Sequence, residues 1–511
     1  MLSSIILTLI TYFALVAPSP TQHPRSGGGP VNWASVVSSR GDRFPDFSYC
    51  GYHNSKISLP SVGTPSVTIP SPKKSSDDMT PAIQDAIDTL ALHGGGIVKL
   101  PSGRLAITAG IQIRSNVIVT GSGTGSSATT LVLKRRPSKP VFTLGKLGFA
   151  EKAEFGFRSK ITNSYVPVGS STVTVKDSSG FAVGQTVYIS RATTESWIRY
   201  NGMINMQQNG QAQTWLQDKT KPEKVNQKIM SPNTIKAVNG KQITFQMPLT
   251  DSLDLKYMKP EVWAYTSPEL SSEMGLQNLG IEVPGSSSCS GTPLNQVTCN
   301  YAAVRFSSWT VDSWASGLTL VGFNNFFEIQ RDASRITIQD STMNRNQNTD
   351  NANSLPFDIL IRGSQVLVQD CAQVGLATAE CFAIGTDSLT PGPNAITRHT
   401  TASSVKQTIS PYARWAQGLL VEDTSTRTEF ANRGAVGGRG WAINAGVGWN
   451  LRGGALFQSP PLGINWCVGC GGSQGPTGNA TFIRSGEQVT PRSLFAAQLN
   501  ARGIDWYDRG D

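Results

Sequence analysis

Residues 77–103 read DDMTPAIQDAIDTLALHGGGIVKLPSG. Asp78 can cap a helix in which Ile83, Ile87 and Leu90 recur with a period of about 3.6 residues. Three glycines after His93 supply the left-handed conformations that commonly end a helix. Short β-rich runs follow, each closed by Pro, Gly, Ser or Asn, at Ile97–Leu100, Ile111–Ile113 and Val117–Val119. One short helix followed by many brief, evenly spaced strands indicates a capped coil of sheets rather than a sandwich.

Similar short runs resume at Leu276 and continue through the second half of the chain. They lie at Leu318–Leu320, Phe327–Ile329, Ile336–Ile338, Phe357–Ile359, Val366–Val368, Phe382–Ile384 and Leu419–Val421. Alternation within each run places one face inside and one outside, and stacking the runs buries a continuous core. Between the two regular parts, at about 150–260, the pattern predicts a β-rich insertion with a polar and aromatic excursion that contains Trp197 and Trp215.

The ends of the chain predict export and a closed coil. The apolar run Ile5–Ala17 is typical of a signal peptide, so we expect a secreted, extracellular protein with no membrane span. We divide the chain into a signal peptide at 1–17, a flexible segment and connector at 18–76, the coil at 77–500 and a tail at 501–511. Within the segment, the aromatics of Phe44–Tyr52 are predicted to cover the first coils. The run Glu487–Leu499 is predicted to form a short helix that closes the coil.

Seven cysteines in an exported chain favour disulfides, with one cysteine left over. The predicted pairs are Cys289–Cys299, Cys371–Cys381 and Cys467–Cys470, which leaves Cys50 as the odd residue. Asn479 begins an Asn-Ala-Thr glycosylation acceptor.

The net charge is +10, and it is dispersed along the chain. No basic run with interleaved aromatics occurs, which argues against a nucleic-acid partner. A dispersed positive field on a secreted protein favours acidic glycans, although it can also serve solubility alone. We expect a monomer that acts on a polysaccharide.

The turn from Gly94 to Gly103, followed by Gly121 and Gly123, resembles the opening of the pectate-lyase-like superfamily. In that family an amphipathic helix plugs the N-terminal end, and a Gly-Gly-Gly-x-Val-x-Leu-Pro-x-Gly turn starts the first coil. The resemblance implies an all-β fold, a right-handed parallel β-helix with an N-terminal capping helix. It does not by itself imply a reaction, because the same coil carries lyases, hydrolases, epimerases and phage adhesins.

A second stretch resembles a subset of that superfamily and covers the candidate site. The matches are Gly392-Pro393-Asn394, Arg414-Trp415-Ala416, Gly418, Asn432-Arg433-Gly434, Gly440-Trp441 and Trp449-Asn450. Where the subset carries histidines, this chain has Tyr412-Ala413 and Arg439. Arginines bind carboxylates bidentately and tryptophans stack on sugar rings, so this stretch is the predicted polysaccharide site. The predicted catalytic residues are Tyr412, Arg414, Arg439, Arg398 and His399. The predicted substrate-binding residues are Trp415, Trp441, Trp449, Asn450, Arg433, Asn394, Trp197 and Trp215.

We expect a polysaccharide lyase, and a glycoside hydrolase and a non-catalytic binding protein stay open as alternatives. Elimination from a uronate needs a cation for the carboxylate and a base for the C5 proton, and Tyr412 beside Arg414 meets that need. Hydrolysis needs two carboxylates about 5–9.5 Å apart, and its candidates are Asp340, Asp358, Asp370, Glu380, Asp387, Glu422 and Asp423. A non-catalytic glycan-binding protein is the third. No cofactor is required by these readings; calcium is an option, but no D-x-D-x-D-G loop occurs and we assign no metal ligand.

Overall fold

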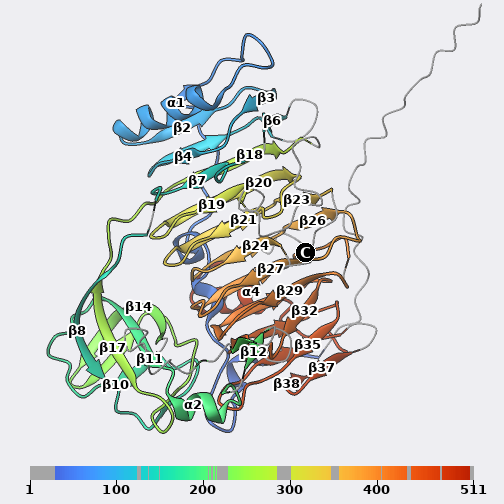
Figure 1. The fold of residues 1–511 in the computed structure, drawn as a ribbon. Coiled ribbons are helices and arrows are strands. Elements are labelled where there is room, and N and C mark those ends of the chain that lie inside the picture. The colour runs from blue at the N-terminus through green and yellow to red at the C-terminus, as the bar shows by residue number, and fades with distance from the viewer. Residues whose placement is uncertain are drawn as a thin grey trace, which may run out of the picture.

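Two long parallel sheets run side by side along the molecule (Figure 1). The structure is a computed structural model that describes residues 29–123, 128–135, 137–148, 150–204, 206–208, 211–212, 215, 228–284, 301–346, 356–403, 405–433, 439–471 and 475–506. The predicted signal peptide and the predicted Cys289–Cys299 pair lie outside these residues.

The first long sheet has 16 strands within the described residues. Its main path is β1 (Val67–Thr68), β2 (Gly96–Lys99), β5 (Val117–Thr120), β18 (Gly275–Glu282), β20 (Val311–Val321), β22 (Ser334–Gln339), β25 (Leu367–Gln369), β28 (Asn394–Thr397), β31 (Leu419–Glu422), β34 (Val447–Trp449), β36 (Trp466–Val468) and β38 (Thr481–Ile483). Beside that path lie β3 (Gly103–Ile107), β6 (Thr129–Leu133), β23 (Thr342–Arg345) and β26 (Ala372–Gly375).

The second long sheet has ten strands within the same residues. They are β4 (Ile111–Ile113), β7 (Phe142–Leu144), β19 (Val304–Phe306), β21 (Phe327–Ile329), β24 (Phe357–Ile361), β27 (Cys381–Thr386), β29 (Gln407–Pro411), β32 (Arg427–Phe430), β35 (Ala455–Phe457) and β37 (Pro476–Gly478). Sequence neighbours alternate between the two sheets, as they do in a coil. The predicted parallel β-helix is therefore confirmed.

The register of the strands places similar side chains above one another, in columns along the coil. Ile338 pairs with Val368, Val368 with Ile396, and Ile396 with Val421, and all four are buried. Because every second residue of a strand points the same way, these columns form the continuous apolar core between the sheets.

Helix α1 (Thr80–Leu92) lies at the N-terminal end of the coil (Figure 1) and buries Ile83, Ile87 and Leu90. Asp78 accepts a hydrogen bond from the Thr80 amide at 3.0 Å, although the residue at the N-cap position is Met79. The turn that follows this helix requires glycine for steric reasons. A Cβ on Gly95, which has φ +107°, would lie 2.2 Å from the Asn116 carbonyl oxygen.

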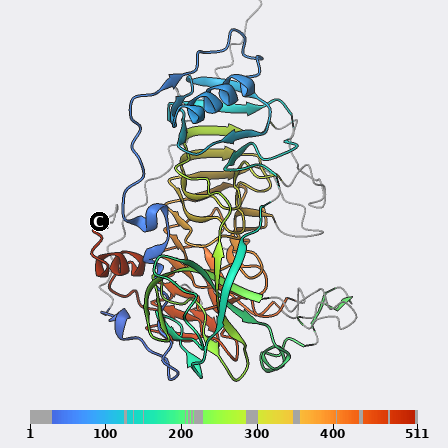
Figure 2. The same cartoon turned by 90° about the vertical axis from the view of Figure 1, so that its left-hand side faces the viewer.

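The β-rich insertion forms an antiparallel sheet with its own core, which we call the module. Its six described strands are β8 (Glu154–Lys160), β10 (Thr172–Thr174), β11 (Thr186–Ala192), β14 (Lys228–Asn239), β15 (Gln242–Phe245) and β17 (Pro260–Thr266). Short pairs join β9 (Tyr165–Val166) to β16 (Leu253–Asp254), β12 (Gln207–Gln208) to β13 (Gln211–Ala212), and β30 (Ala416–Gln417) to β33 (Ile443–Asn444). The chain leaves the coil after β7 and re-enters at β18. Even so, the module lies beside the later strands (Figures 1 and 2).

The two ends of the chain pack on the flank of the coil rather than on its ends. Helix α4 (Leu494–Ala501) and the segment around Phe44 and Phe47 share one apolar cluster with Trp449 and Trp466 of the first long sheet. Figure 2 shows α4 at the side of the coil. The predicted closing helix and the predicted cover over the first coils are thus wrong in position, because the outward face of the later strands is apolar and both segments bury it.

Three short 3₁₀ turns complete the described elements, at Trp33–Ser35, Phe47–Tyr49 and Tyr52–Ser55, together with helix α2 (Glu195–Tyr200) in the insertion. No helix among the described residues is long and apolar enough to cross a membrane.

The cysteines divide between one disulfide and buried thiols. Cys467 and Cys470 form the predicted bridge. Cys371 and Cys381 do not pair, and Cys50 is also free. Cys371 follows β25 of the first long sheet, whereas Cys381 belongs to β27 of the second, where its thiol lies 3.5 Å from the Asp358 carboxylate. The two cysteines are ten residues apart in sequence but lie on different sheets. The prediction of a Cys371–Cys381 disulfide is therefore wrong.

Candidate functional site

A row of polar residues lies where the strands of the second long sheet end. Each follows the last residue of its strand, and we call the set Ser307, Gln330, Arg362, Asp387 and Tyr412 the strand-end row. The amide of each later member donates to the carbonyl at the end of the preceding strand, as Tyr412 does to Thr386 at 3.0 Å and Asp387 to Ile361 at 3.2 Å. Adjacent strands are about 4.8 Å apart, so the row forms a continuous polar line along the coil.

Arg362 joins two carboxylates in this row. Its Nε donates to Asp387 at 2.8 Å, and its Nη1 contacts Glu328. Arg305 contacts Glu328 from the other side at 2.8 Å. Burial would raise the pKa of Glu328, but Arg305 and Arg362 outweigh it, so the pKa lies below its ordinary value. The pKa of Asp387 is lowered in the same way against burial, mainly by its hydrogen bond from Arg362. Both carboxylates are therefore held ionised.

An aromatic patch lies next to these charges. Phe357 and Phe382 stack at 5.0 Å, and Tyr412 meets them edge-on at 5.4 and 5.6 Å. Gly385 makes room for the patch, because a Cβ there would lie 2.4 Å from the Phe357 ring. The patch presents Tyr412 at the surface of the coil, where the residue is half-buried.

Arg439 completes the patch. The carbon of its guanidinium lies 3.8 Å from the centroid of the Tyr412 ring. Burial lowers the pKa of Arg439, and the attraction of Asp387 offsets this only in part. Within the described part of the chain, Arg439 forms no ion pair at salt-bridge distance. A partly desolvated cation on an aromatic face is a site that favours an incoming anion.

Arg414 lies beside the same region with its guanidinium 5.2 Å from the Trp215 ring. Burial also lowers the pKa of Arg414. The indole N–H of Trp215 donates to the Arg439 carbonyl at 3.3 Å. The structure thus places Arg439 on Tyr412, and Trp215 contacts both the Arg414 guanidinium and the Arg439 carbonyl.

The tryptophans that were predicted to stack on sugars are mostly buried. Trp197 and Trp415 are both 0% exposed and meet edge-on at 4.6 Å. Trp215 is 4% exposed, and Trp441 donates to the Asn201 carbonyl at 2.9 Å. These residues form an interface between the module and the coil. The predictions for Trp197 and Trp415 as sugar contacts are wrong, because each ring is covered by the other and by neighbouring aliphatic side chains.

A buried ion pair that the sequence did not suggest holds this interface. The Nε of Arg191 donates to Asp251 at 2.7 Å, and both residues are nearly inaccessible. The Arg191 guanidinium lies over the rings of Trp197 and Trp415 at 4.6 and 5.3 Å. Asp251 also accepts from Asn444 of the coil at 2.7 Å. No local sequence motif predicts such a pair, since its members lie 60 residues apart on different elements.

Arg398 and His399 lie away from Tyr412, because they follow β28 of the first long sheet. Arg398 makes a two-bond ion pair with Asp370 at 2.6 and 2.8 Å. His399 is 0% exposed, and burial lowers its pKa to about 4. A fully buried neutral imidazole cannot touch a polymer, so the prediction of His399 as catalytic is wrong.

Three further predicted contacts are structural. Trp449 is 0% exposed behind Phe44, whose ring lies 6.1 Å away. The Asn450 amide is buried and donates to the carbonyls of Val489 and Arg492, both at 2.9 Å. The Asn394 side chain accepts from the Val366 amide at 2.9 Å. These predictions are wrong because the N- and C-terminal segments cover Trp449 and Asn450, and because Asn394 is buried in hydrogen bonds to neighbouring turns of the coil.

Two predicted surface residues remain accessible. Arg433 is half-buried and donates to Glu429 at 2.9 Å, on the same face as Tyr412. Asn479 is exposed, and its side chain accepts from the Ser459 amide at 3.1 Å.

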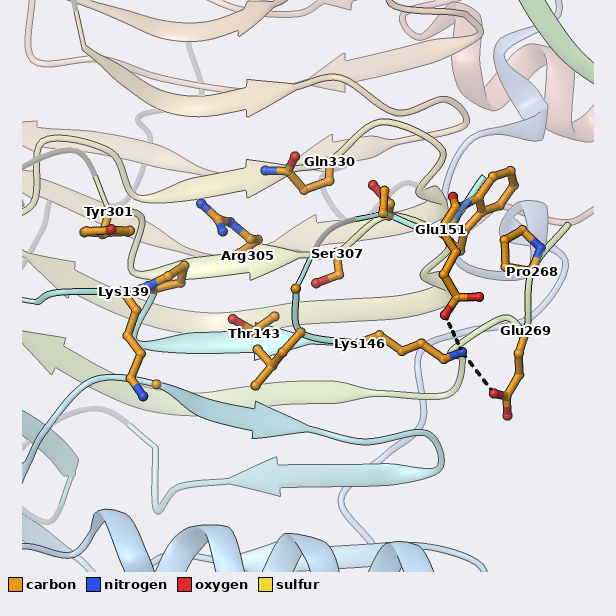
Figure 3. Close-up of a pocket in the computed structure, with 17 residues that line it drawn as sticks. Lys139, Thr143, Lys146, Glu151, Pro268, Glu269, Tyr301, Arg305, Ser307 and Gln330 are labelled. Atoms are coloured by element: carbon orange, nitrogen blue, oxygen red, sulfur yellow. Dashed lines mark hydrogen bonds and ion pairs between the residues drawn. The ribbon is translucent and has the colours of Figure 1, made fainter. Parts of the chain in front are cut away.

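A cavity of about 500 Å³ opens farther along the second long sheet (Figure 3). Thr143, Arg305 and Gln330 project into it from successive strands or strand ends, and Lys139 lies at one end. At its other end Lys146 bridges Glu151 and Glu269 at 3.2 and 3.0 Å. The strand-end row therefore begins in this pocket and leads to the aromatic patch.

One side-chain cluster has the composition of a cation site. His53, Glu273 and Asp312 bring one ligand atom each within 4.8 Å of one another. The imidazole lies between the acids, with Nε2 2.8 Å from Glu273 and Nδ1 3.8 Å from Asp312. Arg335 already binds both oxygens of Asp312 at 2.7 and 2.8 Å. This donor set does not fit calcium, which prefers six to eight oxygens.

Comparisons with known proteins place few constraints on this chain. No protein-family model matches it, and no curated protein does. Among solved structures, a tailspike double mutant of E. coli bacteriophage HK620 in complex with a pentasaccharide has a TM-score of 0.39 at 8% identity. That similarity covers 78% of this chain and 54% of the tailspike, so the chain spans about half the length of that protein.

Two further structures are similar to this chain. The A-module of mannuronan C-5 epimerase AlgE6 from Azotobacter vinelandii has a TM-score of 0.36 at 10% identity, with 80% of this chain and 85% of the module covered. The Gp54 tailspike of Acinetobacter baumannii bacteriophage AP22, in complex with a capsular saccharide, has a TM-score of 0.27 at 9% identity, with 83% and 74% covered. All three TM-scores lie below 0.5, so the function is inferred below from the residues of this chain.

Proposed function

We propose that the protein is a secreted, monomeric polysaccharide lyase that binds an acidic, uronate-containing polymer along the strand-end row. The observation that carries the proposal is the stacking of Arg439 on Tyr412 at 3.8 Å, on the open face of the second long sheet. A parallel coil repeats its side chains at a regular spacing, which suits a polymer whose sugars also repeat.

The chemistry follows from three needs of β-elimination. The carboxylate of the sugar must be neutralised, a base must remove the C5 proton, and the bond to the leaving oxygen must then break. Arg439 and Arg414 can supply the positive charge, because a guanidinium stays protonated even where burial lowers its pKa, and partial desolvation strengthens its attraction to a carboxylate. Tyr412 is the base in this proposal, since a guanidinium over its ring stabilises the phenolate. Once Tyr412 has taken the C5 proton, its hydroxyl can donate that proton to the leaving oxygen.

The charges of the row favour this proposal over hydrolysis. A glycoside hydrolase needs one carboxyl group that stays protonated as an acid. Glu328 and Asp387 are the carboxylates beside the patch, and their arginine partners lower both pKa values. Asp358, another predicted candidate, is 0% exposed and pairs with Arg345 inside the coil at 2.6 Å.

The same observation favours a second function, binding without cleavage. Arginine-paired carboxylates make a stable surface that can hold a glycan through hydrogen bonds without any acid catalyst. On this view Tyr412 and Arg439 would only hold the sugar. The surface would be the same, and only the fate of the polymer would differ.

A digestion experiment separates the functions. The purified protein is incubated with polygalacturonate, polymannuronate, polyglucuronate and neutral polymers. Ultraviolet absorbance of new unsaturated uronate ends supports the lyase, and new reducing ends without that absorbance would indicate hydrolysis. Retention of a polymer on the protein without either product would leave the binding function.

A further inference from the structure

A second cleft lies between the module and the coil. Its volume is about 570 Å³, within the range of about 300–1,000 Å³ that small-ligand sites occupy. Tyr188, Tyr265 and Phe155 reach it from the module, and Trp309 and Asp332 reach it from the turns of the coil. Trp309, Ala150 and Glu151 also line the pocket of Figure 3, so the two cavities adjoin.

The cleft has an aromatic wall and an apolar rim. Tyr188 and Tyr265 stack at 4.3 Å, and the Trp309 ring lies 6.3 Å from Tyr265. At the rim, Phe155 is 53% exposed and Leu270 is 42% exposed, which is unusual for side chains this large. Aromatic faces of this kind pack against the C–H groups of sugar rings.

The polar groups of the cleft are arranged for an uncharged ligand. Arg335 donates from Nε and Nη2 to the two oxygens of Asp312, and the Lys228 ammonium lies 3.7 Å from the Trp263 ring. Arg331 donates to the Ser388 carbonyl at 3.3 Å. Two carboxyl groups line the cleft: Glu151, which pairs with Lys146, and Asp332, which accepts from the Tyr188 hydroxyl at 3.1 Å.

We propose that this cleft is a binding subsite for a neutral sugar, which stacks on the aromatic wall and hydrogen-bonds through its hydroxyls to Asp332. A uronate is disfavoured, because its carboxylate would face Asp332, while Arg335, Arg331 and Lys228 contact protein groups and the fourth lining cation, Lys152, is exposed to solvent. Burial raises the pKa of Asp332 against the effects of Tyr188 and Arg331, so the group also avoids the full cost of a buried charge. Polymers that alternate acidic and neutral sugars, or carry neutral branches, have the chemistry to occupy both surfaces.

This inference extends the proposed function, since the cleft adjoins the polymer surface, but its test is independent of catalysis. The probes are neutral gluco-, galacto-, manno- and xylo-hexaoses, with oligogalacturonate as the charged comparison. Binding to the full-length protein is measured by calorimetry. We expect at least one neutral hexaose to bind, whether or not any polyuronate is cleaved. Absence of unsaturated ends would therefore refute the lyase while leaving this subsite intact.

Two variants locate the binding. Phe155→Ser removes an exposed ring at the rim, and we expect affinity for the bound hexaose to fall about tenfold. Asp332→Ala should weaken it by a similar factor. Val183→Ser is the matched control, because Val183 is 67% exposed on the same module and lies outside the cleft lining. The proposal is overturned if no neutral hexaose binds, if only oligogalacturonate binds, or if both cleft variants bind as the wild type does.

Discussion

The guanidinium of Arg439 lies 3.8 Å above the ring of Tyr412, and the two residues come from different coils of the β-helix. Tyr412 directly follows β29 of the second long sheet, and Arg439 lies between β32 and β33. The contact joins an anion-binding group to a titratable hydroxyl. It is the feature from which the proposed chemistry follows.

Removal of this cation is expected to weaken polymer binding. Arg439→Gln should raise the KM for an acidic polymer at least tenfold, because a charge-assisted contact is worth about 1.5–3 kcal/mol. Arg414→Ala should abolish turnover while the protein stays folded, as checked by circular dichroism. Arg427→Gln is the matched control, since Arg427 already pairs with Glu429 at 2.7 Å and lies outside the patch. Equal kinetics for Arg439→Gln and Arg427→Gln would refute the assignment.

The buried pair of Arg191 and Asp251 at the interface between the module and the coil is expected to govern stability rather than chemistry. Asp251→Ala leaves Arg191 charged among indole rings, so the free energy of unfolding should fall by about 3–5 kcal/mol. Glu195→Ala breaks an exposed pair with Arg199 and should change it by less than about 1 kcal/mol. Denaturant unfolding of both variants measures the difference. Similar losses would mean that Arg191 and Asp251 do not hold the module to the coil.

Glu422 makes stability fall as pH rises. Burial raises the pKa of this carboxyl to about 7, although it accepts hydrogen bonds from Ser493, Leu494 and Phe495 at the start of α4. Because the folded pKa exceeds the unfolded value, the contribution is complete below about pH 4.5 and is lost as pH rises through about 7. Glu422→Gln should remove this dependence, worth about 3 kcal/mol. If the free energy of unfolding depends on pH in the variant as it does in the wild type, Glu422 is not the buried group that causes this dependence.

His399 acts in the opposite direction. Its pKa is lowered to about 4 by burial, so its contribution is complete above about pH 6.5 and is lost as pH falls through about 4. His399→Leu should therefore flatten the loss of stability in acid, and it should leave turnover intact because the ring is inaccessible. Between about pH 4.5 and 6.5, Glu422 and His399 change the free energy of unfolding in opposite directions. Each single variant should therefore show the pH dependence that the other residue causes. A variant with no change in acid stability would show that the imidazole titrates freely.

Much of the coil could be predicted from short-range patterns. The glycine turn before Ile97 and the apolar triplets such as Phe327–Ile329 and Val366–Val368 depend on local backbone and side-chain preferences, and the structure forms strands at each of them. The positions of the ends could not be predicted this way. Phe44 packs on Trp449 and Trp466, residues about four hundred positions later, because of a shared apolar flank and not a local signal.

The site was predictable only in part for a similar reason. Arg439 lies on Tyr412, and Arg414 lies beside Trp215, which bonds to Arg439, but Trp415 is hidden by Trp197 from the module. The strand-end row was missed, although a signal for it exists. Gln330, Arg362 and Asp387 each follow an apolar strand directly, and stacking the predicted strands in register would have aligned them.

Release of unsaturated uronate ends from a purified polyuronate tests the central claim most directly. Absorbance is followed for the wild-type protein and for Tyr412→Phe, which keeps the aromatic packing on Phe357 and Phe382 but removes the hydroxyl. We predict steady release by the wild type and a loss of at least about a hundredfold in the variant. Release at the same rate by Tyr412→Phe, or no release by the wild type from any polyuronate, would contradict the account.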